Sequence, residues 1–419
     1  MENFSSESVL IIGAGQAGIQ VADSLRAEGF TGAITILNDE AHSPYQRPPL
    51  SKDYLGPEST AEPLPLRGPG FFAAKDITLL AATAVSVDTE ARSVRLSGGT
   101  SLDYTHLVFA TGAANRALPC PGSDLDGVHE LRTLTNARRL HDSLSTARKV
   151  VVVGAGFIGL EFAAGARARG LEVTVLEFAP RPMGRALSAT ASDWFTQRHT
   201  GDGIDLRLNE GVAAIHRDGD GLSVESTTGT RYPADLVLYG VGVNPRTELA
   251  QAAGLEVENG IVVDSALRAS VPGVWAVGDC ASFPHRDSGA RMRLESVQNA
   301  TDQGRHAARS IMGDESSYAQ TPWFWSTQGA IRLQIAGVSE PGDEPVLLGD
   351  PAAGKFSIAL LRNGALAAVE SVNSPADHIA ARKLVDLGLA LTTDEISAPG
   401  FSFKALAKSL TGIPQPAPA

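Results

Sequence analysis

The sequence contains only two cysteines in 419 residues, Cys120 and Cys280, and they lie far apart in the chain. They form no C-x-x-C or C-x4-C pair, so the sequence offers no zinc site and we expect no bound metal. An isolated cysteine usually behaves as a small apolar side chain. We therefore expect both cysteines to be buried in apolar packing.

Positive charge is also scarce. The chain has 35 lysines and arginines against 47 aspartates and glutamates, which gives a formal net charge of −12. Non-specific binding to nucleic acid requires a basic surface. We therefore expect no nucleic-acid partner.

Long apolar runs are absent as well. No stretch approaches the roughly 20 apolar residues that span a bilayer, so we expect no membrane association. Residues 1–7 (MENFSSE) lack the basic region and apolar core of a secretory signal. The sequence therefore predicts a cytoplasmic protein.

The most informative segment is residues 9–18, VLIIGAGQAG, where a short apolar run leads into a G-x-G-x-x-G pattern. This pattern predicts a buried parallel strand, a tight turn and the start of a helix. Gly13 permits the turn, Gly15 lets a pyrophosphate approach the backbone, and Gly18 lets the helix pack closely on the strand. The free N–H groups at the start of such a helix favour phosphate.

Residues 150–159, VVVVGAGFIG, repeat the pattern, with Gly154, Gly156 and Gly159 in the same places. A single glycine-rich turn often binds nothing, but two copies that each follow an apolar run are hard to reach by accident. We infer a protein that binds two dinucleotides and passes electrons between them. The expected fold class is α/β, with two Rossmann-like dinucleotide-binding domains and a C-terminal α+β domain.

The second strand of each unit is expected to end near an acid that binds the adenosine ribose. Asp39 and Glu40 follow the first such strand, expected over residues 33–37, and we favour Asp39. A solvated acidic turn is the alternative for Asp39. Glu177 follows the second such strand, expected over residues 173–176.

Glu177 also predicts which nicotinamide dinucleotide is used. A carboxylate at this position can accept hydrogen bonds from both ribose hydroxyls and would repel a 2′-phosphate, so NADH is favoured over NADPH. Arg181 and Arg185 lie nearby and could soften this preference. We expect one of them, Arg185, to steady the pyrophosphate instead.

Residues 44–52, PYQRPPLSK, contain three prolines, which fix φ and remove N–H donors. They predict a stiff, extended segment that could form a wall beside a planar ring, with a purely structural loop as the alternative. Together with the segments above, they resemble the FAD-dependent ferredoxin reductases of bacterial oxygenase systems, within the glutathione-reductase-type flavoprotein superfamily. The resemblance extends over nearly the whole chain through residues 131–134 (LRTL), 274–281 (VWAVGDCA), 293–300 (RLESVQNA) and 322–326 (PWFWS).

The resemblance implies two cofactors, FAD and NADH, with hydride passing from the nicotinamide to the flavin. Relatives that reduce disulfides carry a cysteine pair near residues 47–52, and this chain has none there. Electrons are therefore expected to leave the flavin directly, toward a one-electron acceptor. The resemblance implies a two-iron, two-sulfur ferredoxin that supplies an oxygenase, either a cytochrome P450 or a ring-hydroxylating dioxygenase. An NADH oxidase and a redox-sensing flavoprotein are the alternatives.

The resemblance also implies which residues touch each cofactor. Asp279, at a strand end, could accept hydrogen bonds from ribityl hydroxyls, and Val297, at a helix start, could offer its N–H to the flavin pyrimidine ring. For Arg132 a surface ion pair is the alternative, and for Trp325 an apolar domain interface. The expected FAD residues are Gly13, Gly15, Ala17, Gly18, Asp39, Arg47, Lys52, Val85, Thr111, Arg132, Asp279, Val297 and Trp325. The expected NAD residues are Gly154, Gly156, Ile158, Gly159, Glu177, Arg185 and Gly242.

Lys52 and Glu161 are the catalytic candidates. The resemblance places the acid on the helix after the second glycine turn, where it faces the lysine in a partly buried pair near the hydride path. An ion pair that holds two domains in register is the alternative, and the two roles are compatible. The chain departs from the family at Thr327, where the family usually has aspartate, and at residues 244–246 (NPR), where it usually has valine-proline-asparagine. The second departure leaves the nicotinamide contacts open.

The expected domains are a discontinuous FAD-binding domain over residues 1–116 and 246–320, an NAD-binding domain over 117–245, a C-terminal domain over 321–412 and a disordered tail over 413–419. A helix is expected over residues 295–311. Arginines around it could form a basic docking surface for an acidic ferredoxin, with a solvated helix face as the alternative. They are Arg291, Arg293, Arg305 and Arg309, with Arg332 in the C-terminal domain.

Overall fold

The computed structural model describes residues 4–56, 59, 62–286 and 288–410, so the predicted tail at 413–419 lies outside the described residues. The chain forms two compact units, and each is discontinuous in sequence. The first unit comprises residues 1–46, 63–114 and 243–320, and the second comprises residues 47–62, 115–242 and 321–419. The division into three domains stays a prediction.

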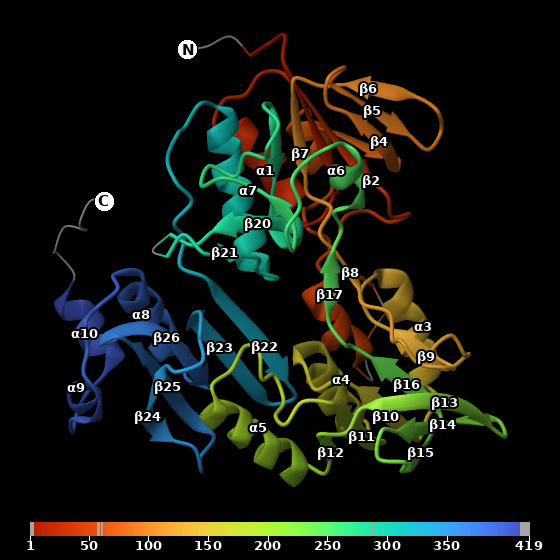
Figure 1. Ribbon diagram of the computed structural model, residues 1–419, viewed down its shortest axis with the longest axis vertical. Helices are drawn as coiled ribbons and strands as arrows, with labels where there is room; N and C mark the ends of the chain where they lie inside the picture. Colours follow the sequence, from red (N-terminus) through yellow and green to blue (C-terminus); the bar gives the residue numbers. More distant parts are fainter. Residues whose placement is uncertain (1–3, 57–58, 60–61, 287, 411–419) are drawn as a thin grey trace. The chain divides into compact units, whose positions relative to one another are not determined.

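The first unit is built on a five-stranded parallel sheet (Figure 1). Its central strand is β1 (Ser8–Ile12), which pairs with β2 (Ala33–Asn38) on one side and β7 (His106–Phe109) on the other. The sheet continues outward to β3 (Thr78–Ala81) and β19 (Val274–Ala276). The run of Val, Leu and Ile in β1 is buried in an apolar cluster that also contains Ala17 and Ala307 and, from outside the parallel sheet, Val87 and Val94.

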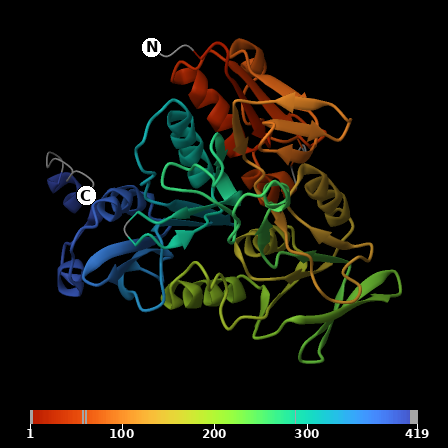
Figure 2. The ribbon, with the colours of Figure 1, turned by 45° about the horizontal axis from the view of Figure 1, so that its top comes forward.

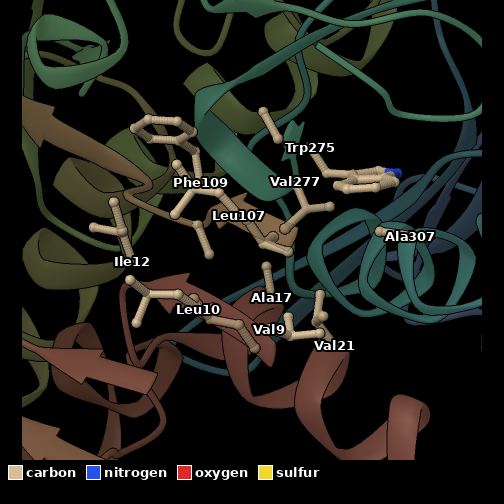
Figure 3. Packing of buried hydrophobic residues seen from close by; sticks show 14 of the residues in the cluster. Val9, Leu10, Ile12, Ala17, Val21, Leu107, Phe109, Trp275, Val277 and Ala307 are labelled. Atoms are coloured by element: carbon tan, nitrogen blue, oxygen red, sulfur yellow. The ribbon is translucent and has the colours of Figure 1, made fainter. Parts of the chain in front are cut away.

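Two helices of this unit, α1 (Gln16–Ala27) and α7 (Val297–Ile311), pack against each other. Figure 3 shows Ala17 and Val21 of α1 and Ala307 of α7 in the apolar cluster around Val9. A Cβ on Gly304 of α7 would lie 3.0 Å from the carbonyl oxygen of Ala17, so a small residue is needed where the two helices meet.

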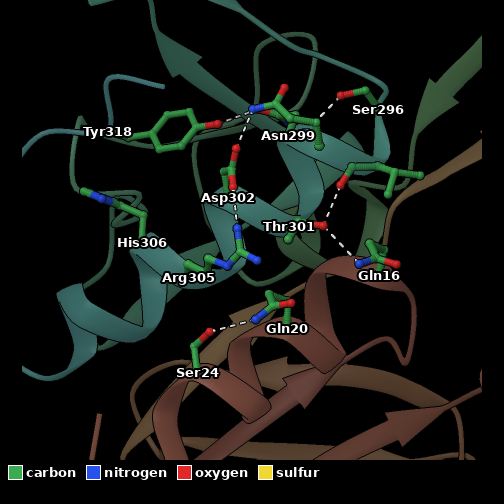
Figure 4. Close-up of polar contacts among 12 residues, drawn as sticks. Gln16, Gln20, Ser24, Ser296, Asn299, Thr301, Asp302, Arg305, His306 and Tyr318 are labelled. Carbon is green, nitrogen blue, oxygen red and sulfur yellow. Dashed lines mark hydrogen bonds and ion pairs between the residues drawn. The ribbon is translucent and has the colours of Figure 1, made fainter. Parts of the chain in front are cut away.

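Polar contacts fix the ends of the same two helices (Figure 4). The Nε2 atom of Gln16 donates to Oγ1 of Thr301 at 3.0 Å. The predicted start of α7 at residue 295 is wrong by two residues. Ser296 is the N-cap, with its hydroxyl accepting from the N–H of Asn299, so the helix begins at Val297.

The remaining elements of the first unit are short. Three of them, β4, β5 and β6, form an antiparallel sheet. The elements are α2 (Phe71–Ala74), β4 (Ala84–Asp88), β5 (Ser93–Leu96), β6 (Ser101–Asp103), α6 (Glu248–Ala252), β18 (Ile261–Val262), η3 (Gly278–Cys280), β20 (Ala281–Pro284) and β21 (Arg291–Met292). Two further strands, β8 (Ala113–Asn115) and β17 (Val243–Pro245), lie where the chain passes between the units.

The second unit repeats the strand–turn–helix pattern of the first. Its parallel sheet has the order β12 (Asp205–Leu208), β11 (Glu172–Glu177), β10 (Lys149–Val153), β16 (Leu236–Tyr239) and β9 (Val128–Glu130). The strand and helix predicted around the second glycine turn are confirmed as β10 and α4 (Phe157–Ala168). The unit also contains α3 (Leu134–Leu144), α5 (Ala189–Gly201), β13 (Val212–Asp218), β14 (Gly221–Ser226) and β15 (Arg231–Ala234).

The C-terminal part of the second unit is an antiparallel sheet covered by α8 (Pro375–Asp386), which packs on β26 and β23 (Figures 1 and 2). This arrangement is the α+β layer that the sequence predicted. The strand order is β22 (Trp323–Gln328), β23 (Ile331–Gly337), β26 (Ala365–Val372), β25 (Lys355–Arg362) and β24 (Glu344–Asp350). Two short helices follow, α9 (Thr393–Ser397) and α10 (Phe403–Ser409).

The proline-rich segment differs from its prediction. Residues 44–52 do not form a single extended stretch, because Pro48–Ser51 form a 3₁₀ helix, η1, followed by a second, η2 (Asp53–Leu55). Proline is tolerated in the first turn of a helix, where its missing N–H would have no partner within the helix. Pro48 and Pro49 therefore begin the turn that carries Ser51 and Lys52.

Cys280 is fully buried in the first unit, as expected, whereas Cys120 is only half-buried. Among the helices of the described ranges, none combines the length and the apolar character needed to cross a membrane.

His378 of α8 is a buried histidine with unusual surroundings. Its side chain is 1% exposed, and within the described part of the chain neither ring nitrogen has a hydrogen-bond partner. Burial, together with the nearby Arg382 and Arg332, lowers its pKa to about 4. His378 is therefore protonated near pH 6.5 in the unfolded chain but stays neutral at that pH in the folded chain.

We expect the free energy of unfolding to fall between pH 7 and pH 5, because the unfolded state binds the proton of His378 first. At pH 5 the lowered pKa of His378 should reduce the free energy of unfolding by about 2 kcal/mol, at about 1.36 kcal/mol per pKa unit. Denaturant titrations at pH 7 and pH 5 measure this decrease in the free energy of unfolding. The His378→Leu variant should lack the part of the decrease that His378 causes. His216→Leu, at a strand position that is 42% exposed, should retain it. An unchanged decrease in His378→Leu would contradict the assignment.

Candidate functional site

The first glycine-rich turn joins β1 to α1. Gly13 has φ +115°, a conformation that side chains rarely adopt, and a Cβ on it would lie 2.3 Å from the carbonyl oxygen of Ala110. A Cβ on Gly18 would lie 2.0 Å from the carbonyl oxygen of Gly13. A Cβ on Gly15 would meet no atom within 4 Å. Gly13 and Gly18 are therefore required by the packing, whereas Gly15 faces open space.

The second turn, between β10 and α4, has the same geometry. Gly154 has φ +101°, and a Cβ on Gly159 would lie 2.1 Å from the carbonyl oxygen of Gly154. A Cβ on Gly156 would meet nothing within 4 Å. Gly15 and Gly156 are the N-caps of their helices, and neither helix has a side-chain cap. Both helix starts thus offer free N–H groups on an open side, as a phosphate site requires.

A cavity of about 360 Å³ opens beside the first turn. It brings together four of the residues expected to bind FAD, namely Gly13, Asp39, Val85 and Thr111. The other lining residues include Leu37, Ala84, Arg246, Leu249 and Ala252. A carboxylate, a guanidinium and apolar walls fit the adenosine end of a dinucleotide, which carries ribose hydroxyls, phosphates and a flat base.

Arg246 is a cavity residue that sequence reasoning missed. From the sequence, residues 244–246 stand out only as a departure from the family on the nicotinamide side. In the structure Arg246 belongs to the first unit, and its Nη1 atom lies 3.2 Å from Oδ2 of Asp39. Its carbonyl oxygen also accepts the hydroxyl of Thr111 at 2.7 Å. No motif spacing could have indicated this pairing, because Asp39 and Arg246 are far apart in sequence.

Glu177 occupies the position expected for a ribose-binding acid at the end of β11. Its Oε2 atom accepts the N–H of Ala155 in the glycine turn at 2.6 Å, and its Oε1 atom accepts the N–H of Ala179 at 2.8 Å. A carboxylate offers about four acceptor positions, so two remain for ribose hydroxyls. The two backbone contacts hold the carboxylate beside the turn.

The two arginines near Glu177 have different roles. The guanidinium of Arg181 donates to the carbonyl oxygens of Leu187 at 2.6 Å and Gly184 at 2.8 Å, so it holds its own loop together. Arg185 is exposed and makes no hydrogen bond or ion pair with another residue of the described ranges. A Cβ on Gly242 would lie 3.4 Å from its Nη2 atom. Arg185 is therefore the arginine available to a ligand. Ile158, another residue expected to bind NAD, is the second residue of α4 and is 38% exposed.

Lys52 and Glu161 form the ion pair that the resemblance implies. The Nζ atom of Lys52 lies 2.7 Å from Oε2 of Glu161, and it also donates to the carbonyl oxygen of Pro48 at 3.1 Å. The side chains are 17% and 4% exposed, respectively. Burial removes the screening that weakens surface ion pairs, so each charge depends on the other.

Two serines complete the surroundings of Glu161, and sequence reasoning did not assign a role to either. The hydroxyl of Ser51 donates to Oε2 at 2.5 Å, and the hydroxyl of Ser326 in β22 donates to Oε1 at 2.7 Å. Both serines are buried. Ser51 precedes Lys52 in the proline-rich segment, and Ser326 follows Trp325, so both lie within quoted motifs. The motifs named the segments but not the contacts.

The remaining residues expected at the flavin are divided between the units. Asp279 lies in η3 and Val297 is the first residue of α7, both in the first unit with Ala17. In the second unit, Nη1 of Arg47 donates to the carbonyl oxygen of Arg132 at 2.8 Å. Trp325 lies in β22, also in the second unit, with its ring centroid 5.5 Å from that of Trp323. The roles of these residues at the flavin stay predictions.

The arginines proposed as a docking surface do not form an uncompensated basic patch. Each of the four around α7 lies within 4 Å of a carboxylate: Arg291 of Glu258, Arg293 of Glu295, Arg305 of Asp302 and Arg309 of Asp314. Arg332 belongs to the other unit. The neighbouring acids could not be recognised from the spacing of the arginines alone. Across residues 4–56, 59, 62–286 and 288–410, no group of three or more His, Cys, Asp or Glu side chains could hold a metal ion.

Comparisons with known proteins cover nearly the whole chain. Residues 7–304 match the family model described as pyridine nucleotide-disulphide oxidoreductase, and residues 323–407 match a reductase C-terminal family. Rhodocoxin reductase of Rhodococcus erythropolis is 46% identical over 399 residues, which is 95% of this chain and 93% of the relative.

Two solved structures are also similar. The ferredoxin reductase for the CYP199A2 system from Rhodopseudomonas palustris superimposes with a TM-score of 0.93 at 45% identity, over 96% of this chain and all of that one. Putidaredoxin reductase, in its covalent complex with putidaredoxin, superimposes with a TM-score of 0.92 at 36% identity, over 97% of this chain and all of that one.

We expect Asp39→Ala to raise the dissociation constant for FAD about tenfold, or ~1.4 kcal/mol, because ribose hydroxyls lose their acceptor in the cavity. Fluorescence titration of FAD into the apoprotein measures this constant. Asp103→Ala, at an exposed position in β6 of the same unit, serves as the control. Equal affinities of the wild type and Asp39→Ala for FAD would contradict this role and favour a solvated acidic turn.

Proposed function

Because the chain belongs to the pyridine nucleotide-disulphide oxidoreductase family and, within it, to the ferredoxin reductases, we propose that it carries electrons from NADH to a two-iron, two-sulfur ferredoxin that serves an oxygenase. The chain is an oxidoreductase that uses FAD and a nicotinamide dinucleotide. FAD, when bound, accepts a hydride and can release its electrons one at a time. The residues of the chain supply binding, orientation and charge.

The proposed FAD site begins in the first unit. The open side of Gly15 gives a pyrophosphate room to approach the N–H groups of α1, and the cavity with Asp39 and Arg246 would hold the adenosine end. These residues fit the cofactor in charge, shape and donor set. We propose that FAD is bound by Gly13, Gly15, Ala17, Gly18, Asp39, Arg47, Lys52, Val85, Thr111, Arg132, Asp279, Val297 and Trp325, with Arg246 added.

The proposed NAD site lies wholly in the second unit. The pair of contacts from Ala155 and Ala179 supports this assignment, because it leaves Glu177 fixed and still able to accept two ribose hydroxyls. Arg185 supplies an unpaired cation for the pyrophosphate. We propose that NAD is bound by Gly154, Gly156, Ile158, Gly159, Glu177, Arg185 and Gly242.

We propose that Lys52 and Glu161 are the catalytic pair. Glu161 keeps the ammonium of Lys52 in one place, and Lys52 balances the charge of a carboxylate that is 4% exposed. A fixed, poorly hydrated ammonium can stabilise negative charge that develops nearby during the reaction.

One feature of the chain supports the proposed function most strongly. It has two glycine turns, and each is followed by an acid at the end of the next strand.

The partner is proposed from the relatives. Rhodocoxin reductase is named for its electron acceptor, and the similar structures belong to the CYP199A2 system and to a complex with putidaredoxin. By this likeness, the oxygenase is a cytochrome P450 or a ring-hydroxylating dioxygenase. We also propose a cytoplasmic location, where NADH is available, and cell fractionation with an antibody to the chain tests it.

Steady-state oxidation of NADH, with and without a two-iron, two-sulfur ferredoxin, tests the function. We expect rapid turnover only when ferredoxin is present. The absorbance spectrum of the ferredoxin then shows that it is reduced. Rapid consumption of oxygen without ferredoxin would identify an NADH oxidase. Slow turnover under every condition would favour a redox-sensing protein.

We expect at least a tenfold preference for NADH over NADPH in kcat/KM, about 1.4 kcal/mol or more, because Glu177 repels a 2′-phosphate. Glu177→Ala should narrow the preference. Glu172→Ala, at an exposed position where β11 begins, should leave it unchanged. A wild-type enzyme that uses both dinucleotides equally would contradict the assignment of Glu177.

Lys52→Met should slow the reduction of bound FAD by NADH about tenfold while the fold survives, because loss of ~1.4 kcal/mol of electrostatic stabilisation has this effect. Stopped-flow absorbance at saturating NADH measures the rate constant. Lys75→Met removes a lysine that is 39% exposed in the first unit and serves as the control. Reduction at the wild-type rate in Lys52→Met would leave the pair with a structural role only.

A further inference from the structure

Glu161 is the end of a line of hydrogen bonds that runs through buried side chains of the second unit. Beyond Ser326, the line continues to Gln328, whose Nε2 atom donates to Oγ of Ser326 at 3.2 Å. The Oε1 atom of Gln328 lies 2.7 Å from Nε2 of His199 in α5. Ser326, Gln328 and His199 are each no more than 1% exposed.

The donors along this line all point toward Glu161. A carbonyl oxygen can only accept, so Nε2 of His199 carries the hydrogen that Oε1 of Gln328 receives. This bond fixes the orientation of the Gln328 amide, whose N–H group then faces Ser326. The oxygen of Ser326 is thereby used as an acceptor, and its single hydrogen is left for Oε1 of Glu161. Burial lowers the pKa of His199, which favours the neutral ring.

The line reaches Glu161 because α4 lies along β22. Phe157, Glu161 and Ala164 fall on one face of the helix, spaced by four and three residues. The ring of Phe157 contacts that of Phe324 with the centroids 4.5 Å apart, and Glu161 accepts the hydroxyl of Ser326. A Cβ on Gly329 would lie 3.7 Å from Cβ of Ala164. Helix α4, which begins at the second glycine turn, thus packs against β22 and the turn after it through these three residues.

The two oxygens of Glu161 receive their donors from different parts of the chain. Oε2 is bound by Lys52 and Ser51, which both belong to the segment with η1 and η2. Oε1 is bound by Ser326 alone among the described residues. Without this contact the carboxylate could rotate about its bond to the Cγ atom, and its ion pair with Lys52 would weaken. The Ser326 contact therefore restrains the oxygen of the carboxylate that Lys52 and Ser51 leave free.

We propose that Ser326 is a positioning residue for the Lys52–Glu161 pair, and that Gln328 and His199 set the direction in which its hydroxyl donates. This inference rests on the proposed function in that it takes the pair to be catalytic. It gives the C-terminal sheet a part in the reaction through a single hydroxyl. Thr327, the neighbouring residue that departs from the family, is not part of the line.

Three variants test the proposal. Ser326→Ala removes the donor to Glu161, and Ser326→Thr retains a hydroxyl. Ser371→Ala is the matched control, because Ser371 is a fully buried serine of the same sheet whose hydroxyl accepts from Ser357 at 3.0 Å. Each variant is purified with FAD. Its lysines are then acetylated with a limiting amount of an amine-reactive reagent, and the label on Lys52 is quantified by peptide mass spectrometry.

In Ser326→Ala we expect the labelling rate of Lys52 to rise about fivefold, which corresponds to ~1 kcal/mol, the typical net contribution of one hydrogen bond. The rate constant for flavin reduction should fall by a similar factor while the dissociation constant for NADH stays within about twofold, because the NAD contacts are untouched. Ser326→Thr should restore both values, and Ser371→Ala should match the wild type.

Wild-type labelling of Lys52 in Ser326→Ala would overturn the proposal, whatever the activity. Faster labelling with an unchanged reduction rate would confirm the positioning but contradict the catalytic role of the pair, which Lys52→Met tests separately. If Ser326→Ala does not fold, Gln328→Met breaks the line one residue further away at similar side-chain volume. It should raise the labelling of Lys52 by a smaller factor, and wild-type labelling in that variant would again overturn the proposal.

Discussion

Strand and helix approach each other so closely at the two glycine turns that only glycine fits there, and this contact positions both helix starts. In both turns a Cβ on the third glycine would lie about 2 Å from a carbonyl oxygen of the first, so no other residue fits. This contact sets each helix start against the end of its sheet, with the second glycine facing open space. The next parallel strand of each sheet then places the acid proposed to bind ribose, Asp39 directly after β2 and Glu177 at the end of β11.

The helix after the second turn, α4, belongs both to the proposed NAD site and to the proposed catalytic pair. Its first residues offer N–H groups to a phosphate, and one turn further along it carries Glu161, which holds Lys52. The same helix lies along β22, so the C-terminal sheet reaches the ion pair through Ser326. Burying an ion pair costs desolvation energy that only good geometry and extra hydrogen bonds offset. The three neutral or charged donors around Glu161 meet this requirement.

The sequence predicted local patterns well and long-range pairing poorly. Both strand–turn–helix units, the acids that follow them and the C-terminal sheet were predicted, because apolar runs and glycine spacing depend on neighbouring residues. The 3₁₀ helix at Pro48 was missed, since proline is equally compatible with extended chain and with a first helical turn. The pairing of Asp39 with Arg246 and the acids opposite the α7 arginines could not be predicted, because they depend on how distant segments meet.

With an open helix start at each turn, the chain is expected to hold two dinucleotides at the same time. Isothermal titration of NAD⁺ into protein that already contains one FAD per chain tests this most directly, with released FAD measured by its fluorescence. We expect one NAD⁺ to bind per chain with all of the FAD retained. Displacement of FAD by NAD⁺, or no binding of NAD⁺ to the FAD-loaded chain, would contradict it.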